Sequence, residues 1–403
     1  MRILHTSDWH IGRQFHNISL LDDQQKVLDQ IIDIIQSHRV DVVLIAGDIY
    51  DRAIPPAKAV SLLDDVLHRI CCELDVPVIM IAGNHDSGDR LGFGARQLME
   101  SGLHIVGPLK EGWEPVVLTD QWGDVAFYGI PYVDPVIVNG VYGTTCKSHD
   151  EALQYLAQSI VTHNQANNTT KRRSVVLSHC FIDGGDACDS ERPLAIGGAD
   201  KVSPKHFEPF SYTALGHLHG RQFKGKPHIR YSGSPMQYSF SEERHKKVVT
   251  LVELLEDGTT EIEDVPLTLP HNMRTIEGLL DDLILAAADD EHCDDYLLVR
   301  LLDTHAILDP MGKLRKVYPN VLHLERPALT AVGRQYSVDR ELLKLQGEGQ
   351  NSSQNSGQSP GQRRGALSMF EDFYQQVCGE TLSSEQGKVI EDMLDECIHG
   401  KES

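Results

Sequence analysis

Short polar clusters rich in aspartate and histidine recur between residues 8 and 219, and each follows a short apolar run. The residues in them that could bind metal or transfer protons are Asp8, His10, Asp48, Asn84, His85, His179, His217 and His219. Ligands in α/β proteins bind beyond the carboxyl ends of strands, so we expect these clusters to converge on one site. Carboxylate, imidazole and amide donors without thiolate favour divalent ions such as manganese or iron over a structural zinc.

The donor set suits two cations that share one carboxylate, since paired catalytic cations lie about 3.5–4 Å apart. Asp48 is the predicted bridge. The predicted ligands of one cation are Asp8, His10, Asp48 and His219, and those of the other are Asp48, Asn84, His179 and His217. His85 is not needed for coordination. We expect it to be catalytic, contacting a phosphoryl oxygen and protonating the leaving oxygen.

The elements that must position these residues are read from the apolar runs. Predicted strands are Arg2–His5, Val42–Ala46, Val78–Ala82, Val125–Ile130, Val175–Leu177 and Tyr212–Leu215. Helical spacing of apolar residues between the early runs, as over Leu28–Ile35 and Leu62–Ile70, predicts helices that cover the sheets. Three later runs, His228–Ser232, Lys247–Leu255 and Glu261–Leu267, lack intervening helices and are predicted as antiparallel additions. The fold class is therefore α/β (α+β), with a layered core.

The chain beyond this core is predicted to form three further parts. Residues 1–265 are the main domain, and 271–330 form a small αβαβ domain with predicted elements Ile276–Ala288, Tyr296–Leu302, Pro310–Val317 and Val321–Leu324. Residues 347–365 contain no large apolar side chain, which predicts a flexible linker. Residues 366–400 carry two amphipathic helices, the second with a capping candidate at Ser383/Ser384. These helices either dock on a partner or fold back on the parent domain.

Composition excludes several classes of protein. The 403 residues include 37 Lys+Arg and 59 Asp+Glu, and the net charge of −22 argues against a lone, high-affinity nucleic-acid binder. No apolar run approaches the roughly 20 residues of a membrane span, and the N-terminus does not resemble a signal peptide. The 8 cysteines contain no CxxC pair, so we expect a protein of the reducing cytoplasm.

Taken together, the motifs D-x-H, G-D-x-x-D, G-N-H-D, a single His and G-H-x-H resemble the calcineurin-like metallophosphoesterase superfamily. The resemblance implies a four-layer αββα sandwich and a two-metal phosphoesterase centre. The ligand sets given above agree with the superfamily motif by motif. Relatives in archaea and eukaryotes carry a histidine where this chain has Asp51, so the resemblance implies that this position supplies no second catalytic histidine here.

Flanking segments narrow the resemblance to the SbcD family, the nuclease subunits of bacterial SbcC–SbcD complexes. The matching segments are SDWHIGRQ, GDIYDRAIPP, GNHDSGDRL, DSERPLAIGG, ALGHLHGRQ and YSGSPMQYSF, with YPNVLHLER in a capping domain and FEDFYQQVCGETLSSEQ in partner-binding helices. The resemblance implies Mn²⁺-dependent hydrolysis of DNA: 3′→5′ exonuclease action on duplex ends and endonuclease action on hairpins or blocked ends. It also implies a coiled-coil SbcC-type ATPase partner in a heterotetramer, and a homodimer through the nuclease domain.

Two other functions remain open at this point. One is a phosphomonoesterase or cyclic-nucleotide phosphodiesterase on the same core, and the other is a binding scaffold with an inactive site. The basic residues Arg13, Arg90 and Lys171–Arg173 either meet the DNA backbone or are surface charges. Trp9, between two predicted ligands, either stacks on a base or packs beneath the site.

Overall fold

The computed structural model describes residues 1–166, 173–192, 201–305, 307–327, 370–371, 374 and 381–399. The chain divides into two compact units, Met1–Met273 and Arg274–Ser403. The predicted linker, 347–365, lies outside the described residues. Within the described ranges, no helix has both the length and the apolar character that crossing a bilayer requires.

Two six-stranded sheets form the centre of the first unit. The first sheet has the order β16 (Thr260–Pro266), β15 (Val248–Leu254), β1 (Arg2–Thr6), β4 (Val42–Ile45), β5 (Val78–Ile81) and β6 (Leu103–Val106). The second has the order β13 (Gln222–Phe223), β14 (Ile229–Tyr231), β12 (Tyr212–Gly216), β9 (Arg173–His179), β8 (Gly123–Ile130) and β7 (Val116–Asp120). Strands β1, β4, β5 and β6 are parallel, as are β8, β9, β12 and β14.

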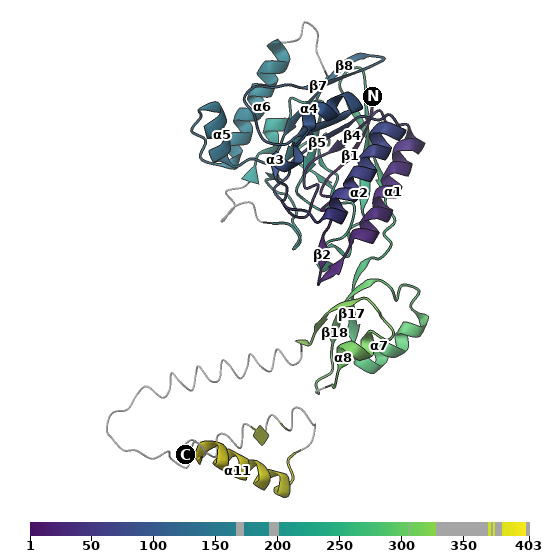
Figure 1. Cartoon of the computed structure of the whole chain (residues 1–403), viewed down its shortest axis with the longest axis vertical. Coiled ribbons are helices and arrows are strands. Elements are labelled where there is room, and N and C mark those ends of the chain that lie inside the picture. The colour runs from purple at the N-terminus through teal and green to yellow at the C-terminus, as the bar shows by residue number, and fades with distance from the viewer. Residues whose placement is uncertain are drawn as a thin grey trace, which may run out of the picture. The chain divides into compact units, whose positions relative to one another are not determined.

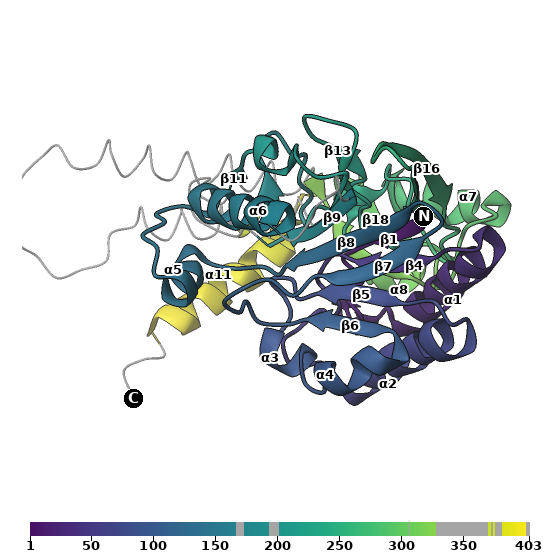
Figure 2. The ribbon, with the colours of Figure 1, turned by 90° about the horizontal axis from the view of Figure 1, so that it is seen from above.

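Helices lie on opposite sides of this pair of sheets (Figures 1 and 2). Helices α1 (Leu21–His38) and α2 (Ala57–His68) lie on one side, and α5 (Pro135–Tyr142) and α6 (His149–Ala166) lie on the other. Shorter elements are α3 (Gly88–Leu91), α4 (Ala95–Leu98), β2 (Gln14–Phe15), β3 (Ile18–Ser19), β10 (Phe181–Ile182), β11 (Lys201–Val202) and the single turns η1 (Arg69–Glu73), η2 (Met99–Ser101), η4 (Pro204–Phe207) and η5 (Phe240–Glu242). The predicted four-layer αββα sandwich is confirmed.

The core between the sheets follows from the alternation of side chains along each strand. Ile3, Val42, Leu44 and Ile79 of the first sheet pack against residues of the second sheet such as Phe127. Alternate residues of a strand point to opposite faces, so the intervening buried residues of the first sheet face the side of α1 and α2. A separate cluster joins the outer face of the second sheet to α5 and α6. Burial on both faces makes these strands nearly continuous apolar runs, which is why the sequence predicts them.

The late strands differ from the prediction in one respect. Strand β15 is antiparallel to β1 and β16, as expected. Strand β14 pairs parallel with β12 and antiparallel with β13, so the expected purely antiparallel addition is wrong there. The two-residue strand β13 supplies the antiparallel partner and is too short to give a sequence pattern.

The globular part of the second unit is a three-stranded sheet with helices. Its elements are β17 (Met273–Gly278), α7 (Leu280–Ala286), η6 (Ala287–Asp289), β18 (Tyr296–Leu301), α8 (Pro310–Leu314) and β19 (Val321–Glu325). The sequence predicts αβαβ with a helix from Ile276, but the structure has a strand up to Gly278, and the order is βαβαβ. The polar residues Arg274, Thr275 and Glu277 make β17 amphipathic, and Leu302 N–H donates to Gly278 O at 3.0 Å.

Near the C-terminus, helix α11 (Ser384–His399) begins at the predicted cap. Ser383 N–H donates to Gln386 Oε1 at 2.9 Å, and Gln386 N–H donates to Ser383 Oγ at 3.3 Å. This reciprocal capping box satisfies backbone donors that a helix start leaves free. The other predicted helix of the tail is described only at residues 370–371 and 374.

Candidate metal centre

Loops at the carboxyl ends of strands from both sheets supply the predicted site residues. Asp8 and His10 follow β1, Asp48 follows β4, and Asn84 and His85 follow β5. From the second sheet, His179 ends β9, while His217 and His219 follow β12. The contacts described below bring these loops together at one place.

The backbone at several of these residues is left-handed. The φ angles are 54° at Asp8, 45° at His10, 49° at Asp48 and 110° at His217. Non-glycine residues adopt such angles only where the surroundings hold them, and functional sites are a common setting. Here the loops hold one another, because Asp8 N–H donates to Gly47 O and His10 N–H donates to Asp48 O, both at 3.0 Å.

Glycine is required where the loops approach each other. A Cβ on Gly83 would lie 2.2 Å from Asp48 Oδ1, and one on Gly47 would lie 2.4 Å from His179 Nδ1. No side chain fits at these distances. The G-D and G-N pairs of the motifs therefore have a steric cause: each glycine makes room for a predicted ligand.

The Asp48 carboxylate lies among three histidine side chains. Its Oδ2 is 3.5 Å from His179 Nε2, 3.7 Å from His10 Nε2 and 3.9 Å from His85 Nε2. The three rings come from three different loops, and Asp48 is 2% exposed. One carboxylate thus reaches imidazoles of both predicted ligand sets.

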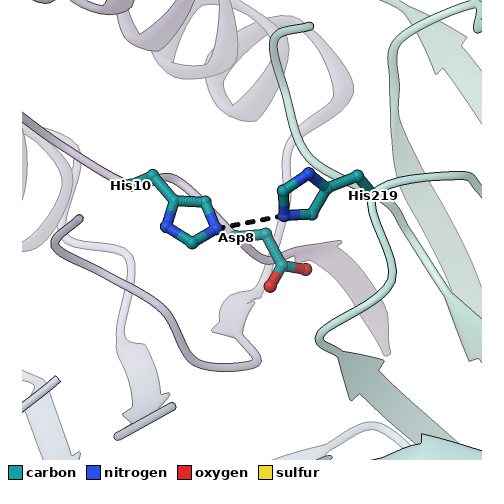
Figure 3. Close-up of side chains that lie close together, drawn as sticks. All are labelled: Asp8, His10 and His219. Carbon is teal, nitrogen blue, oxygen red and sulfur yellow. Dashed lines mark hydrogen bonds between the residues drawn. The ribbon is translucent and has the colours of Figure 1, made fainter. Parts of the chain in front are cut away.

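One group able to hold a cation is Asp8, His10 and His219, whose ligand atoms all lie within 4.8 Å of one another. Figure 3 shows the two imidazoles facing each other above the Asp8 carboxylate, with His10 Nε2 and His219 Nε2 3.1 Å apart. All three residues are buried. The buried Nδ1 of His10 has no hydrogen-bond partner among the described residues.

A second group is Asp8, Asp48 and His179, within the same 4.8 Å limit. His179 Nε2 lies 2.8 Å from Asn84 Oδ1, while its Nδ1 lies 2.9 Å from the backbone oxygen of Ala46. A carbonyl oxygen only accepts, so His179 donates from Nδ1 to Ala46 O, while its Nε2 is directed at Asn84 Oδ1 and the centre of the group. Asp8 belongs to both groups, although the sequence predicts only Asp48 to be shared.

His217 lies beside the second group without being part of it. Its ring centroid is 5.4 Å from that of His179, and its backbone N–H donates to both oxygens of Asp8 at 3.0 and 3.1 Å. In this structure His217 therefore orients the Asp8 carboxylate. Its predicted role as a ligand stays a prediction.

His85 is held in place at both ends. Its backbone N–H donates to Asp48 Oδ1 at 2.8 Å, and its ring Nδ1 donates to Asp51 O at 2.8 Å. The Nε2 atom is left facing the centre. A third group of possible metal ligands comprises His10, Asp51 and His85, so the geometry alone does not separate a ligand from an acid at His85.

Burial sets the electrostatics of the site. It raises the pKa of Asp8 to about 8, and it lowers the pKa of His217 to about 3 and that of His10 well below the usual range. Burial alone would raise the pKa of Asp48, but the imidazoles, His179 foremost, hold it well below its usual value. Burial alone would lower the pKa of His179, but its neighbours, Asp48 foremost, raise it to about 9. Carboxylates and imidazoles together form a donor set that divalent cations fit, since a bound cation favours the ionised carboxylate and the deprotonated ring nitrogen.

Sequence reasoning missed the residues that support the loops. Asp86 accepts hydrogen bonds from the backbone N–H groups of Ile49, Tyr50 and Gly83 at 2.9–3.0 Å, which ties the Asp48 loop to the Asn84 loop. Burial raises the pKa of Asp86 to about 6. Asp86 is the last residue of the GNHD motif, so the motif could have identified it as part of the site. Glu242 is 0% exposed and lies in the YSGSPMQYSFSEE segment.

The sequence left two possible roles each for Trp9, Arg13 and Arg90, and the structure shows what each of them contacts. Trp9 is 1% exposed and donates from Nε1 to Thr6 Oγ1 at 2.9 Å, so it packs within the fold and does not stack on a base. Arg13 pairs with Asp51 Oδ1 at 3.0 Å and lies over the ring of Tyr238. The exposed Arg90 contacts the backbone oxygen of Ala53 at 3.5 Å.

Arg173 corrects the interpretation of the basic triplet. Its side chain is 5% exposed and makes paired hydrogen bonds of 2.5 and 2.9 Å with the carboxylate of Asp120. It is therefore neither a surface charge nor a DNA contact. Lys171 and Arg172 lie outside the described residues.

The chain matches known families over nearly its whole length. Residues 1–221 match the calcineurin-like phosphoesterase family, and residues 269–377 match the type 5 capsule protein repressor C-terminal domain. The D subunit of nuclease SbcCD from Staphylococcus saprophyticus subsp. saprophyticus is 31% identical over 398 residues, which is 98% of each chain. The protein of the same name from Staphylococcus epidermidis is 30% identical over 399 residues, again 98% of each chain.

Among solved structures, a dimetal phosphatase from Danio rerio covers 67% of this chain and 99% of its own, with a TM-score of 0.36 and 12% identity. That similarity is too low to add to the assignment, which rests on the sequence matches. The chain belongs to the calcineurin-like phosphoesterase family and, within it, to the family of nuclease SbcCD D subunits, and it is a hydrolase of phosphodiester bonds.

Proposed function

We propose that this protein is an Mn²⁺-dependent DNA nuclease subunit that works with an ATPase partner in DNA repair, recombination and replication. Its activities are 3′→5′ exonuclease action on duplex ends and endonuclease action on single strands, hairpins and blocked ends. The observation that carries the proposal is the position of Asp48 Oδ2, 3.5–3.9 Å from three imidazoles. Relatives that match 98% of the chain carry the name of a nuclease subunit.

The proposed ligands divide between two cations that share Asp48. Asp8, His10 and His219 complete the first set, and the pair of facing Nε2 atoms supports it. Asn84, His179 and His217 complete the second, supported by the 2.8 Å contact between His179 and Asn84. Oxygen and nitrogen donors without thiolate support Mn²⁺ as the metal.

The two cations, when bound, activate a water molecule for in-line attack on phosphorus and neutralise the phosphoryl oxygens. His85 is the proposed proton donor to the leaving oxygen. The Asp51 carbonyl holds the Nδ1 proton of His85, so Nε2 is the atom that gains and releases a proton. Burial lowers the pKa of His85, and Asp48 Oδ2, 3.9 Å from Nε2, partly offsets this by favouring the charged ring.

The test is hydrolysis by the purified full-length chain with and without Mn²⁺. We expect Mn²⁺-dependent release of nucleotides from linear duplex DNA and cleavage of single-stranded hairpins, and little turnover of cyclic nucleotides. Faster turnover of cyclic nucleotides or phosphomonoesters would reverse the assignment. A chain that retains no transition metal would instead be a binding scaffold.

The proposed partners are DNA and an SbcC-type coiled-coil ATPase in a heterotetramer, in the cytoplasm and at the nucleoid. A net charge of −22 repels DNA, so a partner and bound cations must supply positive charge near the substrate. Helix α11 supports docking, because Val389 and Met393, one turn apart, are each 57% exposed. Such an apolar stripe on a helix suits a groove on another protein.

A homodimer through the nuclease domain completes the proposed assembly. Four exposed apolar side chains of the first unit, Ile54, Val60, Phe93 and Leu98, line one open cavity of about 660 Å³. Exposed apolar patches of this kind mark protein–protein contacts, and we propose that a second copy of this chain covers it. Light scattering should give a dimer for the wild-type chain and a monomer for Phe93→Glu. A Phe93→Glu variant that stays dimeric would move the contact elsewhere.

The proposed domains are a nuclease domain at 1–265, a capping domain at 271–330, a flexible linker at 347–365 and a partner-binding tail at 366–400. The boundary between the compact units after Met273 and the capped start of α11 support this division.

A further inference from the structure

A chain of buried polar side chains ends on the imidazole of His219. Its members are Ser190, Glu242 and Lys247, which are 7%, 0% and 4% exposed. The groups of possible metal ligands among the described residues do not include them. Buried polar groups are costly unless each is paired, so a complete set of pairs beside the metal centre calls for an explanation.

The pairs form one continuous path. His219 Nδ1 lies 2.7 Å from Ser190 Oγ, and Ser190 Oγ lies 2.6 Å from Glu242 Oε1. Lys247 Nζ donates to the other oxygen, Glu242 Oε2, at 2.5 Å. The ammonium neutralises the carboxylate, so the ion pair needs no further counter-charge in the interior.

The backbone of His219 is held by the same neighbourhood. Its N–H donates to Glu191 Oε1 at 2.6 Å, and its carbonyl accepts from Lys247 Nζ at 3.0 Å. Both backbone groups and one ring nitrogen of His219 are therefore occupied by side chains. The remaining atom, Nε2, is the one that faces His10.

Counting protons fixes the tautomer. Paired with the Lys247 ammonium, Glu242 is ionised and can only accept, so the single proton of Ser190 Oγ goes to Glu242 Oε1. Ser190 Oγ must then accept from His219, which places the ring proton on Nδ1 and leaves a lone pair on Nε2. The Nδ1 of His10, unpartnered among the described residues, agrees with this, because it lets His10 Nε2 donate to that lone pair.

We infer that Ser190, Glu242 and Lys247 are positioning residues that fix His219 with its Nε2 lone pair directed at the Asp8–His10 cation position. The inference rests on the metal centre proposed above. None of the three residues contacts the reacting atoms. Supporting partners of this kind change metal affinity by roughly 10- to 100-fold when removed, and that is the effect we expect here.

The first test measures Mn²⁺ binding by the full-length chain, with free Mn²⁺ counted by electron paramagnetic resonance. Ser190→Ala should bind one of two Mn²⁺ ions roughly 10- to 100-fold more weakly. The matched control is Ser239→Ala, because Ser239 Oγ donates to the same Glu242 Oε1 at 3.2 Å. The described contacts of Ser239 do not include His219, so this control should bind Mn²⁺ as the wild type does.

The second test needs no metal and reads the tautomer directly. Ring ¹⁵N shifts of the metal-free wild type should give His219 as the Nδ1–H form, assigned by its loss in His219→Asn. Ser190→Thr keeps the hydroxyl and should keep that form. Ser190→Ala should reduce its population, because the contact that remains, His219 Nδ1 with Glu242 Oε1, is 3.4 Å long. This readout separates a positioning role from a loss of folding.

Outcomes against the inference are distinct from those against the metal centre. A wild-type chain that binds no pair of Mn²⁺ ions overturns both. A wild type that binds two, with Ser190→Ala equal to it or Ser239→Ala equally weakened, overturns only the positioning role. So does an Nε2–H tautomer of His219 in the metal-free wild type.

Discussion

At the scale of single residues, one carboxylate links the two halves of the site. Asp48 presents Oδ2 to the imidazoles of His10, His85 and His179, while its Oδ1 accepts the His85 backbone N–H at 2.8 Å. A carboxylate that reaches imidazoles of both proposed ligand sets can serve two cations at once. The first two predictions follow from this arrangement.

Asp48→Ala should lose both metal ions. Each proposed ligand set contains Asp48, and without it the surrounding imidazoles have no shared negative charge to hold a second cation nearby. Metal content after dialysis, measured by atomic emission, gives the answer. Asp183→Ala is the matched control, since Asp183 is exposed and pairs with Lys201. One ion retained at full occupancy would argue against the bridge.

His85→Ala should keep the metal ions and DNA binding but reduce cleavage at least ~100-fold, the usual contribution of a positioned acid. Metal content, DNA affinity and single-turnover cleavage should be measured on the same preparation. His68→Ala, which removes an exposed histidine of α2, should be unchanged in all three. Loss of metal from His85→Ala would make His85 a ligand, as its grouping with His10 and Asp51 permits.

At the scale of elements, the strands have a catalytic edge and an opposite, structural edge. The metal-centre loops follow the carboxyl ends of β1 and β9. At the other end of these strands, Met1 precedes β1 and Arg173 begins β9. Both bind Asp120 at the end of β7, with the N-terminal ammonium 3.0 Å from Asp120 Oδ2. One carboxylate thus joins the two sheets on the side away from the site.

Asp120→Asn should lower the free energy of unfolding by roughly 1.5–3 kcal/mol at pH 7, the range for hydrogen bonds to charged groups. Burial alone would raise the pKa of Asp120, but the hydrogen bonds from Arg173 and the terminal ammonium hold it well below its usual range. The stabilisation is therefore present above the unfolded pKa of ~3.9 and is lost as the pH falls through the folded value.

Urea unfolding of the wild type and Asp120→Asn across pH 2–7 checks this prediction. The difference between the two curves should begin to shrink below pH ~4 and be smallest at pH 2, because the folded pKa of Asp120 lies below this range. Asp33→Asn makes the same chemical change on the exposed face of α1 and should shift stability by less than ~0.5 kcal/mol. A difference between wild type and Asp120→Asn that persists unchanged at low pH would show that the carboxylate charge is not its cause.

At the scale of the whole molecule, the net charge and the division into two compact units both indicate that cleavage and partner binding are separate functions. An excess of acidic residues gives −22 over 403 residues, which opposes unaided binding to DNA. The apolar stripe of α11 belongs to the second compact unit, apart in sequence from the metal-centre residues. Chemistry and partner binding should therefore be separable by mutation.

Removing residues 366–403 should leave Mn²⁺-dependent cleavage of single strands intact while abolishing association with the ATPase. Val389→Asp with Met393→Asp should have the same effect in the full-length chain, because charges replace an apolar contact. Glu391→Ala changes an exposed polar position on the same helix and should keep the complex. Co-purification and single-strand cleavage are the two readouts. A complex that survives the deletion would place the contact elsewhere.

The strands, the polar residues that follow them and the family could all be predicted from sequence, since residues adjacent in the chain encode each of them. The cap of α11 was predictable for the same reason, because Ser383 and Gln386 lie three positions apart. The G-D and G-N pairs were visible as motifs, although the steric reason for each glycine was not.

Which atoms meet depends on contacts that no local pattern contains. Ser190 and Glu242 are 52 positions apart, and nothing nearby in the chain predicts that their contact orients His219. The buried pair of Arg173 with Asp120 spans 53 positions, so a basic triplet at a strand start gave no hint of it. The helix predicted from Ile276 is wrong over the end of β17, because that strand forms by pairing with β18. In each case the deciding force is packing between distant segments, which overrides local propensity.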